Sequence, residues 1–158
     1  MIFEIYFTPL YCNGNLNLSV VINQQLCATW QHSDKCQEQQ ISFRSALSPT
    51  SAFQLQLVFD GKNQSQDTVL DDAGKIIHDK AIVIDQIKIN DILVCHELFL
   101  VPFLTESGQI ITKTNYFGFN GKFTIDCHPN LNEWLNQCKA QLQKPLQNYD
   151  AFLKEILL

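Results

Sequence analysis

The segment Leu16-Asn17-Leu18-Ser19-Val20-Val21-Ile22-Asn23 alternates between apolar and polar side chains, with a large apolar residue at every second position. Successive side chains of a β-strand point to opposite faces, so a period of two predicts a strand with one buried face. Similar alternation, or a short run of β-branched and aromatic residues, recurs along most of the chain. The further predicted strands are 2–7, 26–30, 41–47, 53–59, 81–89, 92–103, 110–119 and 122–127.

Glycine and asparagine separate these strands at positions where a turn needs positive φ. The strongest hairpin signal is Asn120-Gly121, which lies between Phe119 and Phe123. In segment 81–89 the alternation slips by one residue at Asp85-Gln86, which predicts a β-bulge. About nine short strands without intervening helices predict a mainly β fold, an antiparallel two-sheet sandwich of jelly-roll type spanning residues 1–128.

The last part of the chain, residues 129–158, changes to a helical period. Asn130 and Glu133 form a variant of the capping box, which predicts a helix start, and Pro145 predicts a kink. We expect this helical segment to pack on the sandwich or on a partner. An apolar stripe follows the proline, and we predict that it binds a partner protein. Its residues are Leu146, Tyr149, Phe152, Leu153, Ile156 and Leu157.

Composition excludes several classes of protein. The chain has 158 residues, 46% of them hydrophobic and 17% charged, as expected for one globular unit. A formal net charge of -5 argues against a phosphate-binding surface, so we expect no nucleic-acid partner. No apolar run is long enough for a membrane helix, and the first residues do not read as a secretory signal.

Six cysteines are spaced widely and irregularly, and no Cys-x-x-Cys motif is present. This spacing does not resemble a small disulfide framework, so we predict reduced thiols. Reduced thiols without an export signal favour a virion or a host cytoplasm as the location.

Acidic residues surround Gly74 in the segment 67–75. Carboxylates around a glycine turn are typical of calcium sites, and the candidate ligands are Asp67, Asp71 and Asp72. The spacing does not match an EF-hand, and the alternative is a solvated hairpin in which Asp71 and Asp72 make Asx turns. We favour the hairpin, with no cofactor.

Four aromatic rings occur in the eight residues 116–123. Strand alternation places some of them on each face, so an exposed Tyr116 beside the amides of Asn115 and Asn120 is a candidate glycan-binding surface. The alternative, which we favour for Phe117, Phe119 and Phe123, is a place in the core. Trp30 and Trp134 are likewise expected to pack on the core.

Catalytic motifs are absent from the sequence: no histidine lies in a known nucleophile or metalloprotease pattern. Folding could still bring together Cys27 with His32 or Cys127 with His78, so a hydrolase with a dispersed site remains an alternative. We predict no catalytic residues.

Residues 67–92, with the later segment 116–121, resemble small jelly-roll proteins encoded by tailed bacteriophages. They are also similar to the β-sandwich of calcium-dependent carbohydrate-binding modules, and the resemblance covers about 53–127. The first resemblance implies a virion component of the head, tail or baseplate that docks on neighbouring proteins. The second implies a glycan-facing surface. Our leading hypothesis is a non-enzymatic virion assembly protein in a homo- or hetero-oligomer, and the alternative is a carbohydrate-binding module.

Overall fold

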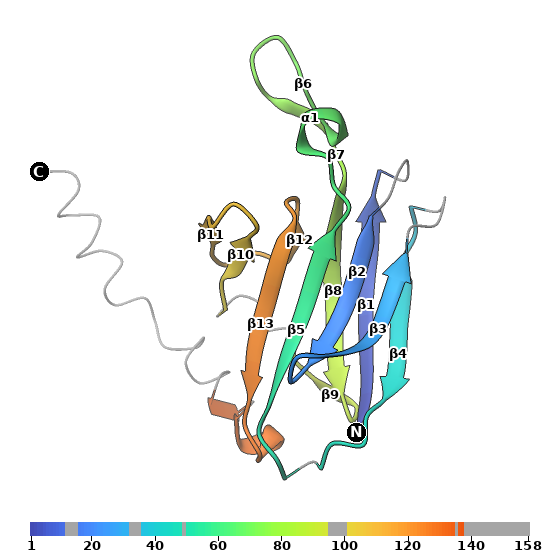
Figure 1. Cartoon of the computed structure of the whole chain (residues 1–158), viewed down its shortest axis with the longest axis vertical. Coiled ribbons are helices and arrows are strands. Elements are labelled where there is room, and N and C mark those ends of the chain that lie inside the picture. The colour runs from blue at the N-terminus through green and yellow to red at the C-terminus, as the bar shows by residue number, and fades with distance from the viewer. Residues whose placement is uncertain (12–15, 32–35, 49, 95–100, 135, 138–158) are drawn as a thin grey trace, which may run out of the picture.

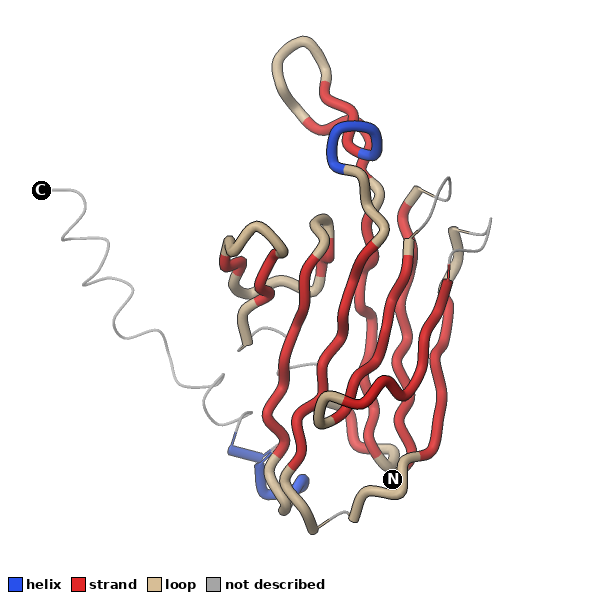
Figure 2. The backbone as a smooth tube through the Cα atoms, viewed as in Figure 1, coloured by secondary structure: helices blue, strands red, loops and turns tan. Residues whose placement is uncertain are grey.

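The computed structural model describes residues 1–11, 16–31, 36–48, 50–94, 101–134 and 136–137. They form two packed antiparallel sheets with a smaller hairpin that projects beyond one end (Figure 1). The predicted mainly β, antiparallel two-sheet sandwich is confirmed. Figure 2 shows how strands dominate the backbone and how little helix accompanies them.

The first sheet has five strands in the order β12-β8-β1-β4, with β9 also paired to β8. Inward side chains alternate along its central strand, where Phe3, Ile5 and Phe7 are fully buried. Its strands are β1 (Ile2–Leu10), β4 (Gln39–Arg44), β8 (Ala81–Ile89), β9 (Ile92–Leu93) and β12 (Tyr116–Phe117).

The second sheet has six strands in the order β11-β10-β13-β5-β2-β3. Apolar side chains of its strands point toward the first sheet, and polar ones alternate with them on the outer face. Its strands are β2 (Asn17–Ile22), β3 (Gln25–Gln31), β5 (Phe53–Asp60), β10 (Phe103–Thr105), β11 (Ile110–Ile111) and β13 (Gly121–Cys127).

Aromatic rings join the two sheets across the core. Phe117 of β12 packs on Phe103 of β10, with 4.6 Å between ring centroids, and Phe3 meets Phe53 edge-on at 5.8 Å. Phe117 and Phe123 are fully buried, while Phe119, Trp30 and Trp134 are partly buried against the core. The core positions predicted for these aromatic residues are therefore confirmed.

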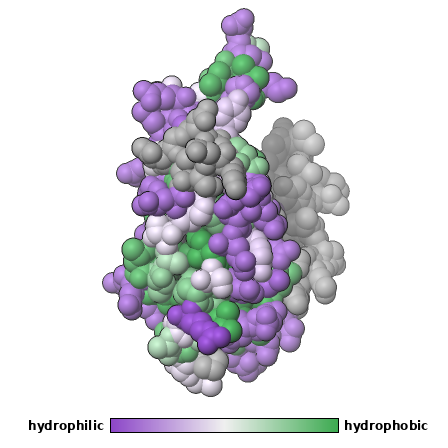
Figure 3. Space-filling view, turned by 90° about the vertical axis from the view of Figure 1, so that its right-hand side faces the viewer, coloured by the Kyte–Doolittle hydropathy of each residue, from purple (hydrophilic) through white to green (hydrophobic). Residues whose placement is uncertain are grey.

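A third, two-stranded sheet lies in a projecting arm, which we define as residues 62–80. The arm consists of the short helix α1 (Gln64–Asp67) and the hairpin of β6 (Thr68–Leu70) and β7 (Ile76–Asp79). Apolar side chains on the arm are exposed, and hydrophobic colour is visible there at the top of Figure 3. They are Val69, Leu70, Ile76 and Ile77.

The bulge predicted at Asp85-Gln86 is confirmed. In the pairing of β1 with β8, Tyr6 faces Gln86 but the next residue, Phe7, faces Ile84, so Asp85 is the extra residue. Because of this insertion, both Ile84 and Ile87 remain buried although they are three residues apart.

The segment 110–119 is not the single strand that its alternation predicts. It forms β11 and β12, which lie in different sheets, and Lys113 between them has a φ of 56°. The chain therefore crosses from one sheet to the other at this point. Similarly, the predicted strand 92–103 is represented by β9 at its start and β10 at its end, and residues 95–100 lie outside the described part.

The hairpin predicted at Asn120-Gly121 is wrong. β12 pairs with β8 of the first sheet, whereas β13 pairs with β5 and β10 of the second, so Asn120 lies in a crossing between sheets. Glycine is needed at position 121 for close approach: an added Cβ would lie 2.4 Å from the carbonyl oxygen of Leu104. The Asn-Gly dipeptide indicates a turn, but it does not indicate which sheet the next strand joins.

The helix start predicted at Asn130 is confirmed, because residues 131–134 and 136–137 are helical. The Glu133 N–H donates to Asn130 Oδ1 at 3.4 Å, and Asn130 Nδ2 donates to the Glu133 carboxylate at 2.9 Å. Pro145 and the apolar stripe from Leu146 to Leu157 lie outside the described residues.

The prediction of six reduced thiols is wrong at Cys36, which is disulfide-bonded. A disulfide requires Cα atoms within about 7 Å, and this separation is set by the fold rather than by spacing along the chain. Cys27 is a half-buried free thiol. Among the described residues, no helix is long and apolar enough to cross a membrane.

Candidate functional site

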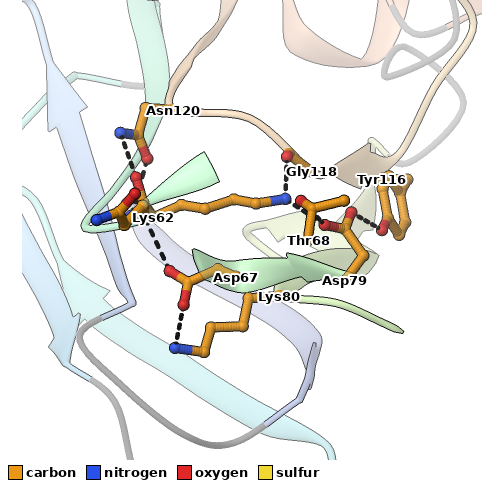
Figure 4. Close-up of polar contacts among 9 residues, drawn as sticks. Lys62, Asp67, Thr68, Asp79, Lys80, Tyr116, Gly118 and Asn120 are labelled. Carbon is orange, nitrogen blue, oxygen red and sulfur yellow. Dashed lines mark hydrogen bonds and ion pairs between the residues drawn. The ribbon is translucent and has the colours of Figure 1, made fainter. Parts of the chain in front are cut away.

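Lys62 lies at the base of the arm and is separated from the end of β5 by Gly61. Gly61 turns the chain there with a φ of 85°, a conformation that suits glycine. The Lys62 side chain is only 2% exposed, and its Nζ donates to a carboxylate oxygen of Asp79 and to the carbonyl oxygen of Gly118 (Figure 4). Nζ also lies 5.7 Å from the centre of the Phe119 ring, within the range of a cation–π interaction.

Asp79 is the acceptor that joins the arm to the sandwich. One oxygen of its carboxylate accepts from Lys62 and, at 2.6 Å, from the hydroxyl of Thr68, and the other accepts from the hydroxyl of Tyr116. Removing one partner of a buried ion pair typically costs about 3–5 kcal/mol of stability, because the other charge remains buried. These contacts therefore hold β6, β7 and β12 together at the base of the arm.

The Tyr116 hydroxyl is held in its protonated form. Burial raises the pKa of Tyr116 above its ordinary value, and both the hydrogen bond to Asp79 and the negative charge of Asp79 raise it further. A deprotonated oxygen would face the carboxylate, whereas the neutral hydroxyl donates to it. The phenol ring itself remains exposed.

A second ion pair supports the base of the arm. Asp67 accepts from Lys80 Nζ at 2.5 Å and from the backbone N–H of Asn63 at 2.7 Å. Burial acts to raise the pKa of Asp67, but these hydrogen bonds and the positive charges of Lys80 and Lys62 outweigh burial and lower it. Asp67 is therefore a structural carboxylate of the arm.

A cleft of about 270 Å³ opens beside this network, on the second sheet. Its lining includes the apolar residues Val58 and Leu104 and the polar residues Asp60, Glu106, Asn120 and Lys122. Within the described part of the chain, neither the Glu106 carboxylate nor the Lys122 ammonium has a hydrogen-bonding or ionic partner. The lining of the cleft thus combines apolar side chains with an acceptor and a donor that no described residue engages.

A larger cavity of about 530 Å³ lies at the other end of the sandwich, beside Met1 and Leu131. Two of its three lining amides are already engaged: Asn90 accepts from the Ile2 N–H at 2.9 Å, and Asn130 is bonded to Glu133. We favour the smaller cleft as the candidate site, because the Glu106 carboxylate and the Lys122 ammonium in its lining, which are opposite charges, have no partner among the described residues.

The three residues predicted to bind a glycan have different environments. Asn120 lines the cleft, but its amide bonds the backbone of Lys62, with Lys62 N–H to Oδ1 and Nδ2 to Lys62 O both at 3.0 Å. Asn115 donates to the carbonyl oxygen of Ile84 at 3.0 Å, and Tyr116 bonds Asp79. Tyr116 is exposed as expected, and their glycan-binding role stays a prediction.

The candidate calcium ligands do not converge. Asp67 pairs with Lys80 at the base of the arm, whereas Asp71 is at its tip, where Oδ1 accepts from the N–H groups of Ala73 and Lys75 at 3.0 and 2.8 Å. The Asx turn predicted for Asp71 is confirmed. In the described ranges, no three His, Cys, Asp or Glu residues are close enough to hold a metal ion. Asp67 and Asp71 thus lie at opposite ends of the arm, and calcium binding by Asp67, Asp71 and Asp72 stays an untested alternative.

Sequence reasoning missed Lys62, Asp79, Glu106 and Lys122. Lys62 and Asp79 are 17 positions apart and meet only because the arm folds back on itself. The cleft residues come from β10, β13 and β5, which are neighbours in the sheet but not in sequence. The pair Cys127 and His78, by contrast, is not assembled: β13 ends at the end of the sandwich opposite the arm that carries His78 (Figure 1).

No family model matches the sequence, and no curated protein matches it. Two solved structures have a similar fold. The first, vCBM60 in complex with galactobiose, is 12% identical, with a TM-score of 0.51 over 80% of this chain and 98% of that one. The second is the selenomethionine form of vCBM60, from work on circular permutation between two families of calcium-dependent carbohydrate-binding modules. It is also 12% identical, with a TM-score of 0.53 over 79% of this chain and 89% of that one.

Proposed function

We propose that this protein is a non-catalytic carbohydrate-binding module whose glycan binds in the cleft between β5, β10 and β13. The observation that carries this proposal is the cleft itself, whose lining places Glu106 and Lys122, neither with a partner among the described residues, beside the apolar Val58 and Leu104. The fold resembles that of vCBM60, which is described in complex with galactobiose. The fold likeness supports glycan binding over the virion role, which has no support among the comparisons.

The cleft offers the two kinds of contact that a sugar ring requires. The C–H groups of a pyranose present an apolar face, which Val58 and Leu104 would cover. Its hydroxyls both donate and accept hydrogen bonds, so one would donate to the Glu106 carboxylate and a neighbouring one would accept from Lys122 Nζ. At about 270 Å³ the cleft is slightly smaller than sites for drug-sized ligands, which suits a ligand unit as small as one sugar ring.

Calorimetric titration with galactobiose and other disaccharides tests this assignment. Hydrogen bonds to charged groups contribute about 1.5–3 kcal/mol, so Glu106→Gln and Lys122→Ala should each weaken binding about tenfold or more. Glu38→Gln and Lys75→Ala are matched controls on exposed charged residues outside the cleft, and they should bind as the unmodified protein does. An equal loss of affinity in the control variants, or no loss in the cleft variants, would contradict glycan binding in this cleft.

An oxidising compartment fits this function and also the disulfide at Cys36, since disulfides persist mainly outside the cytoplasm. We therefore propose an extracytoplasmic location in place of the cytoplasm. Mass spectrometry of protein isolated with its thiols blocked tests it: Cys36 should be found in a disulfide. Free Cys36 in all of the isolated protein would contradict this location.

Protein docking is a second candidate function, favoured by one observation. The arm exposes Val69, Leu70, Ile76 and Ile77 by 43–57%, and a group of large apolar side chains on a projecting element is typical of a binding surface. This is compatible with glycan binding, because the arm and the cleft are separate surfaces.

A further inference from the structure

Lys62 contacts the segment that leads into one wall of the cleft. This crossing segment, which we define as residues 118–120, lies between β12 and β13. Lys62 Nζ donates to Gly118 O at 2.5 Å and lies 5.7 Å from the centre of the Phe119 ring. The backbone of Lys62 exchanges two hydrogen bonds of 3.0 Å with the amide of Asn120. A single residue therefore contacts three successive residues of the crossing segment (Figure 4).

The crossing segment ends in the cleft. Asn120 lines the cleft together with Gly121 and Lys122, the first two residues of β13. On the other side of Lys62, residues 58–60 at the end of β5 line it as well. Lys62 is not among the lining residues and its side chain is buried, so it does not touch a ligand in the cleft. An effect of Lys62 on binding would therefore act through the backbone that it holds.

Asp79 fixes the ammonium against the crossing segment. Its carboxylate is 9% exposed and accepts from Lys62 Nζ and from the hydroxyls of Thr68 and Tyr116. The crossing segment packs closely on this group: a Cβ added at Gly118 would lie 2.5 Å from the Tyr116 ring and 3.0 Å from an Asp79 carboxylate oxygen. The ammonium cannot leave Gly118 O without also breaking a buried ion pair, which is costly.

We propose that Lys62 is a positioning residue of the cleft, which holds the crossing segment so that Gly121 and Lys122 keep the geometry that binds a ligand. The inference rests on the proposed glycan binding in this cleft. Without the ammonium, Gly118 O loses its donor and the crossing segment can move, so fewer molecules have a binding-competent cleft. Apparent affinity falls in proportion to the competent fraction, about tenfold if one molecule in ten is competent.

Hydrogen exchange tests the positioning without any sugar. In Lys62→Met, which keeps the aliphatic chain but has no donor, the amides of residues 119–122 should exchange about tenfold or more faster, while β1 stays protected. Lys80→Met is the matched control, because it removes the other ion pair at the base of the arm, which joins Lys80 to Asp67 within the arm. It should leave exchange at 119–122 unchanged. Unchanged exchange there in Lys62→Met, or an equal rise in both variants, would overturn the proposal.

Calorimetric titration with galactobiose measures the effect on binding. Lys62→Met should weaken the affinity about tenfold or more, and Lys80→Met should bind as the unmodified protein does. If the unmodified protein binds and Lys62→Met binds equally well, the positioning role is wrong and the proposed function stands. If the unmodified protein binds neither galactobiose nor the other disaccharides, the proposed function is wrong, and the positioning of a binding site falls with it.

The double variant Lys62→Met with Asp79→Asn separates positioning from a general loss of stability. Lys62→Met leaves the Asp79 charge buried without a counter-charge, whereas the double variant leaves neither charge, so urea denaturation should show that part of the lost stability returns. Its affinity for galactobiose should stay about tenfold weaker, because Gly118 O still lacks the Lys62 donor. Recovery of affinity together with stability would show that Lys62 only keeps the protein folded and would overturn the proposal.

Discussion

The carboxamide of Asn120 pairs with both backbone groups of Lys62, with hydrogen bonds of 3.0 Å in each direction. Because a carboxamide has one donor and one acceptor group, it can bond both an N–H and a carbonyl group, as a neighbouring strand would. The pairing joins the end of β5 to the crossing that leads into β13. It therefore fixes one wall of the cleft and the entrance of the arm together.

Asn120→Asp should destabilise the protein by about 1–3 kcal/mol, because the Lys62 carbonyl loses its donor and faces a carboxylate oxygen. Urea denaturation measures the change. Asn132→Asp is the matched control, since Asn132 is exposed and lies in a helical segment rather than in paired strands. An equal effect of both substitutions would show that added charge, and not the lost pairing, is responsible.

Gly121→Ala should destabilise the protein by steric conflict. The new Cβ would lie 2.4 Å from Leu104 O and 2.8 Å from Thr105 Cα, and backbone atoms cannot move aside without disturbing β10. Overpacking of this kind typically costs about 1–3 kcal/mol. Gly108→Ala is the comparison: it has open space but a φ of 86°, so it reports the cost of backbone strain alone.

A Gly121→Ala variant as stable as the unmodified protein in thermal denaturation would contradict the close approach of β13 to β10. The two substitutions should also differ in ligand binding. Gly121 lies in the cleft wall and Gly108 does not, so only Gly121→Ala should weaken a bound glycan.

Stability should fall at alkaline pH through Tyr116. Its pKa is raised in the folded protein, so its contribution is fully present below the ordinary tyrosine pKa of 10.0 and is lost as the pH rises toward the folded pKa. Unfolding followed above about pH 10 should show a shallower decline in Tyr116→Phe than in the unmodified protein. Parallel declines would indicate that Tyr116 does not bond Asp79.

The C-terminal stripe from Leu146 to Leu157 remains a docking prediction. Deleting 146–158 should leave a protein that melts cooperatively, because the described core is formed by strands of both sheets. Analytical ultracentrifugation of the full and truncated chains tests the docking role, and self-association should be lost on truncation. Aggregation or loss of the melting transition would instead place the segment in the core.

Strand positions and the bulge could be predicted because both depend on local alternation. The alternation at Phe3, Ile5 and Phe7 predicts that their side chains are buried, and the slip in alternation at Asp85-Gln86 predicts the inserted residue of the bulge. Sheet membership could not be predicted, since Phe117 and Phe123 share one apolar pattern but belong to different sheets. Turn composition alone does not encode that crossing.

Less of the candidate site than of the fold could be predicted from the sequence. Exposure of Tyr116 follows from alternation, but its bond to Asp79 depends on how the arm folds back. Glu106 and Lys122 are ordinary surface residues in sequence, and only the pairing of β10 with β13 makes them neighbours. A disulfide at Cys36 is likewise a property of the fold rather than of cysteine spacing.

Amide chemical-shift mapping during titration with galactobiose tests whether a glycan binds in the cleft, because it locates a bound sugar residue by residue. We expect saturable shifts concentrated at residues 58–60, 104–106 and 120–122, which line the cleft. Shifts concentrated instead around Met1 and Asn130, at the larger cavity, would contradict the assignment of the site. The absence of any saturable shift with galactobiose or the other disaccharides tested would contradict glycan binding itself.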